Sequence, residues 1–162
     1  MATYNDSAIA EALKTVSINR VFHQPVHKIW KAWSDPEFFI KWWGPKEFTC
    51  PYCSIDFKEG GKYVAAMRDK DGNDTWSTGT YKEILPQQKI VYLDSFADSL
   101  GNLVDSAFYN MPQMPNVTLV TITLEASEGT TSMRLEHQGI PEEMYDDCVK
   151  GWNSSLDKME DL

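Results

Sequence analysis

Basic residues are scarce in this chain of 162 residues. Lysine and arginine number 15 against 24 aspartates and glutamates, so the formal net charge is −9. Nucleic acids and anionic membranes recruit proteins through basic surfaces, so this balance argues against both as partners. No apolar run approaches the roughly 18 residues of a membrane span. The N-terminal residues have neither a basic start nor a long apolar stretch, so we predict no secretory signal and a soluble, cytoplasmic protein.

Cysteine and histidine are also few, at three residues each. A zinc site needs three or four convergent ligands, so we predict no metal. The chain lacks a GxSxG motif, a phosphate-binding loop and a paired-carboxylate spacing, so no cofactor is predicted and nothing compels catalysis. The length fits one domain that folds without disulfides. We expect a single domain over residues 1–162, with an N-terminal arm (1–14) and a core (15–162).

Aromatic residues, by contrast, are plentiful. Six tryptophans, seven tyrosines and seven phenylalanines make up 12% of the chain. Large aromatic side chains line cores, pockets and interfaces alike. Composition alone therefore leaves a tryptophan-rich core and a ligand pocket equally open.

The periodicity of apolar residues separates strands from helices. Alternating, β-branched segments predict strands, and tight turns between them predict an antiparallel sheet. The predicted strands cover residues 15–22, 48–57, 62–68, 76–85, 90–96, 117–126 and 131–137. A three- to four-residue spacing predicts two short helices between Pro25 and Gly44, which meet at Asp35, and a long amphipathic helix from Pro141. Residues 6–14 are expected to form a short helical arm.

Several short blocks of the sequence occur in a recognisable order. They are residues 20–22, 25–30, 35–37, 42–45 (WWGP), 56, 60–61, 67–68, 71–72, 79–84 and 151–152. This pattern resembles the homologues of the heat-shock protein 90 ATPase activator, within the START-like (SRPBCC) superfamily, and it covers about residues 15–160.

The resemblance implies an α+β helix-grip fold with a deep apolar cavity. In that fold, a curved antiparallel sheet of six to seven strands wraps around the C-terminal helix, and two short helices follow the first strand. Members of the superfamily carry lipids or polyketides, bind hormones, cyclise aromatic rings, sequester metabolites or activate a chaperone in stress responses. Because the fold hosts all these activities, it does not select one.

Cys50 and Cys53 form a CPYC motif that looks like a glutaredoxin active site. That chemistry needs the first cysteine at a helix N-terminus, where its pKa is lowered. Here a strand and a turn follow the motif, so we read both residues as strand cysteines and leave a redox role open. Cys148 lies on the apolar face of the last predicted helix.

Two ionisable residues are expected on the apolar face of the sheet. His137 shares strand parity with buried positions, and Asp94 lies between two aromatic residues of its strand. Both are weak catalytic candidates, and the alternative for His137 is a strand-end position in solvent or a structural hydrogen bond. Arg20 shares parity with apolar residues, and we expect it to pair with Asp56 or Glu37.

The cavity is expected to be lined mainly by aromatic residues. The candidates are Trp30, Trp33, Trp42, Trp43, Tyr63, Met67, Trp76, Tyr81, Tyr92, Phe96, Phe108, Met111, His137, Cys148 and Trp152. Residues 94–116 form a long connection between strands, and the 108–114 segment is expected to cap the cavity mouth. Gly151 costs on the order of 1 kcal/mol within a helix, which a close approach of ligand or sheet would explain.

We therefore interpret the chain as a binder of a small hydrophobic or aromatic molecule, acting by carriage or sequestration. The alternatives are an enzyme of the cyclase, dehydratase or hydrolase kind in the same cavity, and a module that modulates a chaperone ATPase. The chaperone reading is weakened because the activator's separate N-terminal domain has no counterpart here. The sequence leaves the oligomeric state open, a homodimer included.

Overall fold

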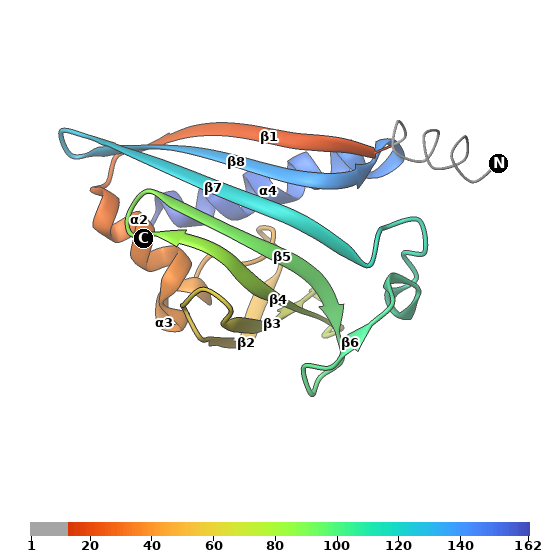
Figure 1. Ribbon diagram of the computed structural model, residues 1–162. Coiled ribbons are helices and arrows are strands. Elements are labelled where there is room, and N and C mark those ends of the chain that lie inside the picture. Colours follow the sequence, from red (N-terminus) through yellow and green to blue (C-terminus); the bar gives the residue numbers. More distant parts are fainter. Residues whose placement is uncertain (1–12) are drawn as a thin grey trace.

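An eight-stranded antiparallel sheet curves around one long helix in the computed structural model, which describes residues 13–162 (Figure 1). The strands are β1 Leu13–Phe22, β2 Thr49–Ile55, β3 Lys62–Arg68, β4 Asp74–Leu85, β5 Lys89–Ala97, β6 Leu103–Val104, β7 Val117–Ser127 and β8 Thr130–Pro141. Their order is β1-β8-β7-β5-β4-β3-β2, and β6 pairs with β5 outside this path. The α+β helix-grip architecture expected from the sequence is confirmed.

Three α-helices and two 3-10 turns complete the described part of the chain. They are α2 Val26–Ser34, α3 Pro36–Phe39, η1 Ser106–Tyr109, η2 Glu142–Met144 and α4 Tyr145–Glu160. The Asp35 side chain accepts a hydrogen bond of 2.9 Å from the backbone N–H of Glu37, so it caps α3 as predicted. Figure 1 shows α2 and α3 at one end of the sheet and β6 at the other.

The second short helix is shorter than the sequence suggested. It ends at Phe39, and the next residues form turns in which the Lys41 and Trp42 amides bond to carbonyls three residues earlier. These tighter turns, and a φ of +97° at Gly44, change the chain direction before β2. The expected helical arm over residues 6–14 lies outside the described residues, apart from Leu13 and Lys14, which begin β1.

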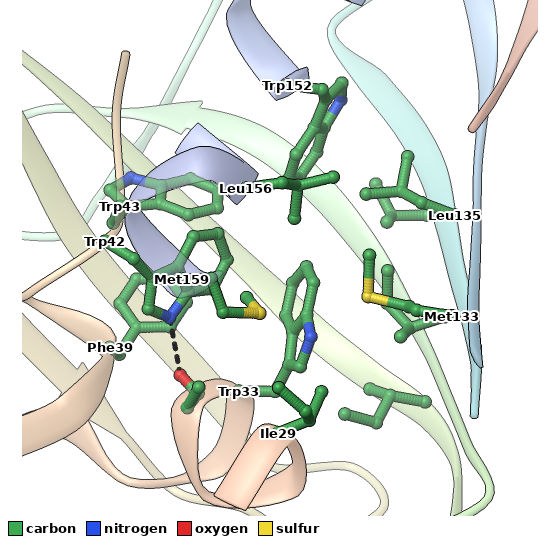
Figure 2. Packing of buried hydrophobic residues seen from close by; sticks show 14 of the residues in the cluster. Ile29, Trp33, Phe39, Trp42, Trp43, Met133, Leu135, Trp152, Leu156 and Met159 are labelled. Atoms are coloured by element: carbon green, nitrogen blue, oxygen red, sulfur yellow. Dashed lines mark hydrogen bonds between the residues drawn. The ribbon is translucent and has the colours of Figure 1, made fainter. Parts of the chain in front are cut away.

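The end of the sheet near α2 and α3 is filled by packed aromatic rings (Figure 2). The ring centroids of Trp33 and Trp42 lie 4.6 Å apart, and those of Phe39 and Trp43 lie 4.7 Å apart. Trp42 is completely buried, and its indole N–H donates a hydrogen bond of 2.7 Å to the Ala32 carbonyl. This cluster joins both short helices to α4.

Helix α4 holds the loop between α3 and β2 in place. The Lys158 ammonium donates hydrogen bonds of 3.2 Å to the carbonyls of Pro45 and Phe48. The Lys46 amide donates a bond of 2.7 Å to the Ser154 hydroxyl. These bonds tie the WWGP block to the helix that the sheet encloses.

The predicted partner of Arg20 is wrong. Its guanidinium lies 2.8 Å from the carboxylate of Asp157, not near Asp56 or Glu37. The reason is that β1 packs along α4, so the nearest acidic group comes from the last helix. Asp157 is 71% exposed, so this pair contributes little to stability.

Within residues 13–162, no helix has the length and apolar character to cross a lipid bilayer.

We predict that Trp42→Ala lowers the free energy of unfolding by about 3–5 kcal/mol, because it leaves a cavity in the aromatic cluster. Urea denaturation followed by circular dichroism measures this loss. Phe108→Ala is the control, because its side chain is 61% exposed and its removal should change the value by less than about 0.5 kcal/mol. Equal effects of the two substitutions would contradict the assignment of Trp42 to the core.

Candidate functional site

A cavity opens at the end of the sheet where β5 leads into the connection to β7. It has two adjoining parts, of about 430 Å³ and about 230 Å³, which share Trp43, Met67, Asp94 and Cys148. Met111 and Met114 of the connection line the larger part, and α4 closes the other side. Volumes of this size are typical of sites for small molecules.

A row of residues crosses the concave face of the sheet beside this cavity. The strand register pairs Tyr63 with Gly79, Gly79 with Asp94, and Asp94 with Thr118. A Cβ atom at position 79 would lie 2.5 Å from the Tyr63 ring and 1.9 Å from the Leu93 carbonyl oxygen. Only glycine therefore lets the Tyr63 ring cross β4, where its hydroxyl donates a hydrogen bond to the Asp94 carboxylate.

Asp94 is a half-buried carboxyl group facing both parts of the cavity. Burial raises its pKa to about 6, and the hydrogen bond from Tyr63 opposes this rise by stabilising the charged form. At neutral pH the group is therefore mostly ionised. A carboxylate among apolar walls can accept hydrogen bonds from a ligand or exchange a proton with it.

His137 faces the inner side of the sheet, as its parity predicted, but both of its ring nitrogens are engaged. The Trp152 indole N–H donates to Nδ1 at 3.0 Å, and Nε2 lies 2.8 Å from the Thr118 hydroxyl. Because an indole N–H can only donate, Nδ1 must be unprotonated and Nε2 carries the hydrogen. Burial lowers the pKa of His137 to about 4, so the ring is neutral. This histidine ties β8 and β7 to α4.

The structure divides the predicted cavity residues into three groups. Those that line the open cavity are Trp43, Met67, Trp76, Phe96, Met111, His137, Cys148 and Trp152. A closed void of about 10 Å³, which is no larger than one water, lies instead among Trp33, Tyr63, Tyr81 and Tyr92. Trp30, Trp42 and Phe108 line neither space.

Besides the four residues around the small void, four more aromatic residues of that prediction need a correction in their placement. Trp30 packs edge-on against Phe57, with ring centroids 5.4 Å apart, and Trp42 belongs to the aromatic cluster. Trp76 reaches only the rim, because its ring packs against Tyr52 on the convex face, at a centroid distance of 5.5 Å. Of the predicted cap, Met111 and Met114 line the cavity, whereas Phe108 points to solvent.

Sequence reasoning missed several residues of the cavity wall. Met144, Thr118 and Ser155 are the clearest of them. The sequence could have indicated Met144 and Ser155, because their helical spacing from Cys148 places all three on one face. Thr118 could be found only through its register with Asp94.

The cysteines do not form a thiolate site. Cys50 and Cys53 lie in β2 rather than at a helix N-terminus. Burial raises the pKa of Cys50 to about 11 and that of Cys53 to about 12, which is opposite to the shift that a reactive thiol needs. Residues 13–162 contain no group of three or more His, Cys, Asp or Glu side chains that could hold a metal ion.

Comparison with known protein families identifies the family of this chain. A family model described as Activator of Hsp90 ATPase homolog 1-like protein matches residues 23–162. The chain belongs to this family. The resemblance inferred from the sequence blocks is therefore confirmed, and the cavity described above belongs to a family member with the helix-grip fold.

Solved structures of the same fold come from several bacteria. A protein from Arthrobacter aurescens has 27% identity and a TM-score of 0.78, covering 93% of this chain and 86% of its own. One from Chromobacterium violaceum has 27% identity and a TM-score of 0.76, covering 91% and 95%. The AHSA1 protein from Silicibacter pomeroyi has 20% identity and a TM-score of 0.72, covering 91% and 96%. No curated protein matches the chain.

We predict that Asp94→Asn makes the protein more sensitive to acid. The folded state binds the Asp94 proton more tightly than the unfolded chain does, because its pKa is raised to about 6, so Asp94 adds stability as the pH falls from 6 to 4. His137, whose pKa is lowered to about 4, makes the folded state less stable as the pH falls through 6.5 towards 4. In Asp94→Asn only the destabilising effect of His137 remains.

Urea denaturation at pH 7 and pH 4.5 tests this prediction. Acidification should cost the variant up to about 2 kcal/mol more than the wild type. Glu125→Gln, an exposed position on β7, serves as the control and should follow the wild type. Identical pH profiles for Asp94→Asn and the wild type would show that the carboxyl group is not buried in the folded state.

Proposed function

We propose that this protein binds a small hydrophobic or aromatic molecule in the cavity around Asp94, for carriage or sequestration. The observation that carries this proposal is the cavity itself, with about 430 Å³ in its larger part. The cavity is open at the protein surface, so a molecule can enter it, and its volume lies in the range of small-molecule sites. Its wall is mainly apolar and holds few polar groups, which is the usual composition of a ligand pocket.

Two features of the wall support a ligand rather than a packing defect. Met67, Met111, Met114 and Met144 line the space, and unbranched methionine side chains adapt to varied apolar shapes. Trp43 lines both parts, so its large aromatic side chain would contact a ligand in either of them.

An acid–base enzyme is the second candidate, and Asp94 favours it. Its raised pKa and its position in the cavity suit a general acid or base. His137 does not suit that role, because both ring nitrogens are engaged in hydrogen bonds within the protein. For the chaperone-modulating alternative, the exposed Leu100, Leu103 and Phe108 on the β5–β7 connection would be the surface available to a protein partner.

We predict that the neutral fluorophore N-phenyl-1-naphthylamine binds with one-to-one stoichiometry and that Gly151→Leu weakens its binding by about tenfold or more. Gly151 lines the smaller part, and a Cβ there would meet only Pro45, at 3.9 Å. A leucine at this position therefore fills the cavity without a backbone clash. Replacing a helix-interior glycine should also keep or raise the melting temperature.

Fluorescence titration and thermal unfolding together check this prediction. Lys150→Leu is the matched control, because it adds the same side chain to the exposed neighbouring position of α4. The control should bind the fluorophore as the wild type does. If the wild type gave no saturable binding, or if Gly151→Leu bound as tightly as Lys150→Leu, the cavity would not be the binding site.

A further inference from the structure

The charged side chains that line the cavity are all of one sign. Asp94 lies inside it, and the exposed Asp147 stands at its rim. Among residues 13–162, no lysine or arginine lines either part, and Lys158 is bonded to the backbone carbonyls of Pro45 and Phe48. His137 is neutral, with its ring nitrogens engaged by Trp152 and Thr118. An anionic ligand would therefore meet repulsion from Asp94 and find no cation among the lining side chains.

Asp94 also has unused capacity to accept hydrogen bonds. A carboxylate offers about four acceptor positions. The Tyr63 hydroxyl is the one side-chain hydrogen-bond donor that residues 13–162 present to it, and no cation of the described chain forms an ion pair with it. A carboxylate removed from water without a positive partner is unfavourable. A cation bound beside it would relieve this cost.

The walls next to Asp94 suit the rest of such a ligand. Trp43 and Trp152 present aromatic rings, which attract cations through their faces and also bury apolar groups. Met67 and Met114 extend the apolar surface in the larger part. The net charge of −9 further favours the approach of a positively charged molecule.

We propose that the ligand of this cavity is a hydrophobic amine, with its ammonium group at the Asp94 carboxylate and its apolar body among Trp43, Trp152 and the cavity methionines. This inference rests on the proposed binding function and assigns the chemical class of the ligand. The Tyr63 hydroxyl and the backbone N–H of Ser95 occupy two acceptor positions of Asp94 and leave the others for the ammonium.

Three naphthalene compounds of the same size test the charge directly. They are 2-naphthylmethylamine, 2-naphthylmethanol and 2-naphthoate, which at pH 7.5 are cationic, neutral and anionic. Each competes with N-phenyl-1-naphthylamine for the wild-type protein in a displacement titration. We expect the amine to bind about tenfold more tightly than the alcohol, and the carboxylate to bind more weakly than both.

Substitutions then assign the preference to a residue. Asp94→Asn should reduce the advantage of the amine over the alcohol to less than about threefold. Asp147→Asn, at the rim, should have a smaller effect, and Asp146→Asn, which is exposed on the same helix and lines neither part, should have none.

The outcomes separate this inference from the proposed function. If the alcohol displaces the fluorophore but the amine shows no advantage, or if Asp94→Asn retains the full advantage, the amine assignment is overturned and the binding function stands. If none of the three compounds displaces the fluorophore, the cavity does not bind small aromatic molecules and both proposals fail. The wild-type comparison of the three compounds decides the charge preference even if Asp94→Asn does not fold.

Discussion

The packing of tryptophans at one end of the sheet decides where this fold is hollow. The concave face of the sheet is wider than a single helix can cover, so other side chains must fill the remaining space. Trp33 and Trp42 fill the end near α2 and α3, where Trp42 is completely buried (Figure 2). At the opposite end, Met111 and Met114 of the β5–β7 connection line the remaining space without filling it. The cavity lies between the aromatic cluster and the β5–β7 connection.

Trp43 and Trp152 form the boundary between the solid and hollow ends. Their ring centroids lie 5.8 Å apart, and both contribute to the cavity wall as well as to the aromatic cluster. The polar groups beyond them have different roles. His137 is satisfied by Trp152 and Thr118 and holds the elements together, whereas Asp94 keeps acceptor capacity towards the cavity. The structural hydrogen bonds and the proposed ligand contact thus involve neighbouring but separate residues.

The sequence predicted the local features, and its family resemblance predicted the architecture, but individual long-range contacts were predicted poorly. Strand alternation predicted the bounds of β3, and Asp35 was recognised as a helix cap, because both depend on nearby residues. The sequence could not show that Trp43 lines the cavity and Trp42 does not, because the turn after Phe39 sets the directions of both side chains. The partner of Arg20 depends on how β1 packs along α4, and no local pattern encodes that contact.

Methyl NMR of the methionines tests the central claim most directly, because the chain carries reporters in both halves. Met67, Met111, Met114 and Met144 line the cavity, whereas Met133 and Met159 are buried in the filled core. On titration with N-phenyl-1-naphthylamine, the account predicts that the four cavity methyl signals shift with one common saturation curve while the two core signals stay in place. Shifts confined to Met133 and Met159, or no shifts at saturating fluorophore, would contradict it.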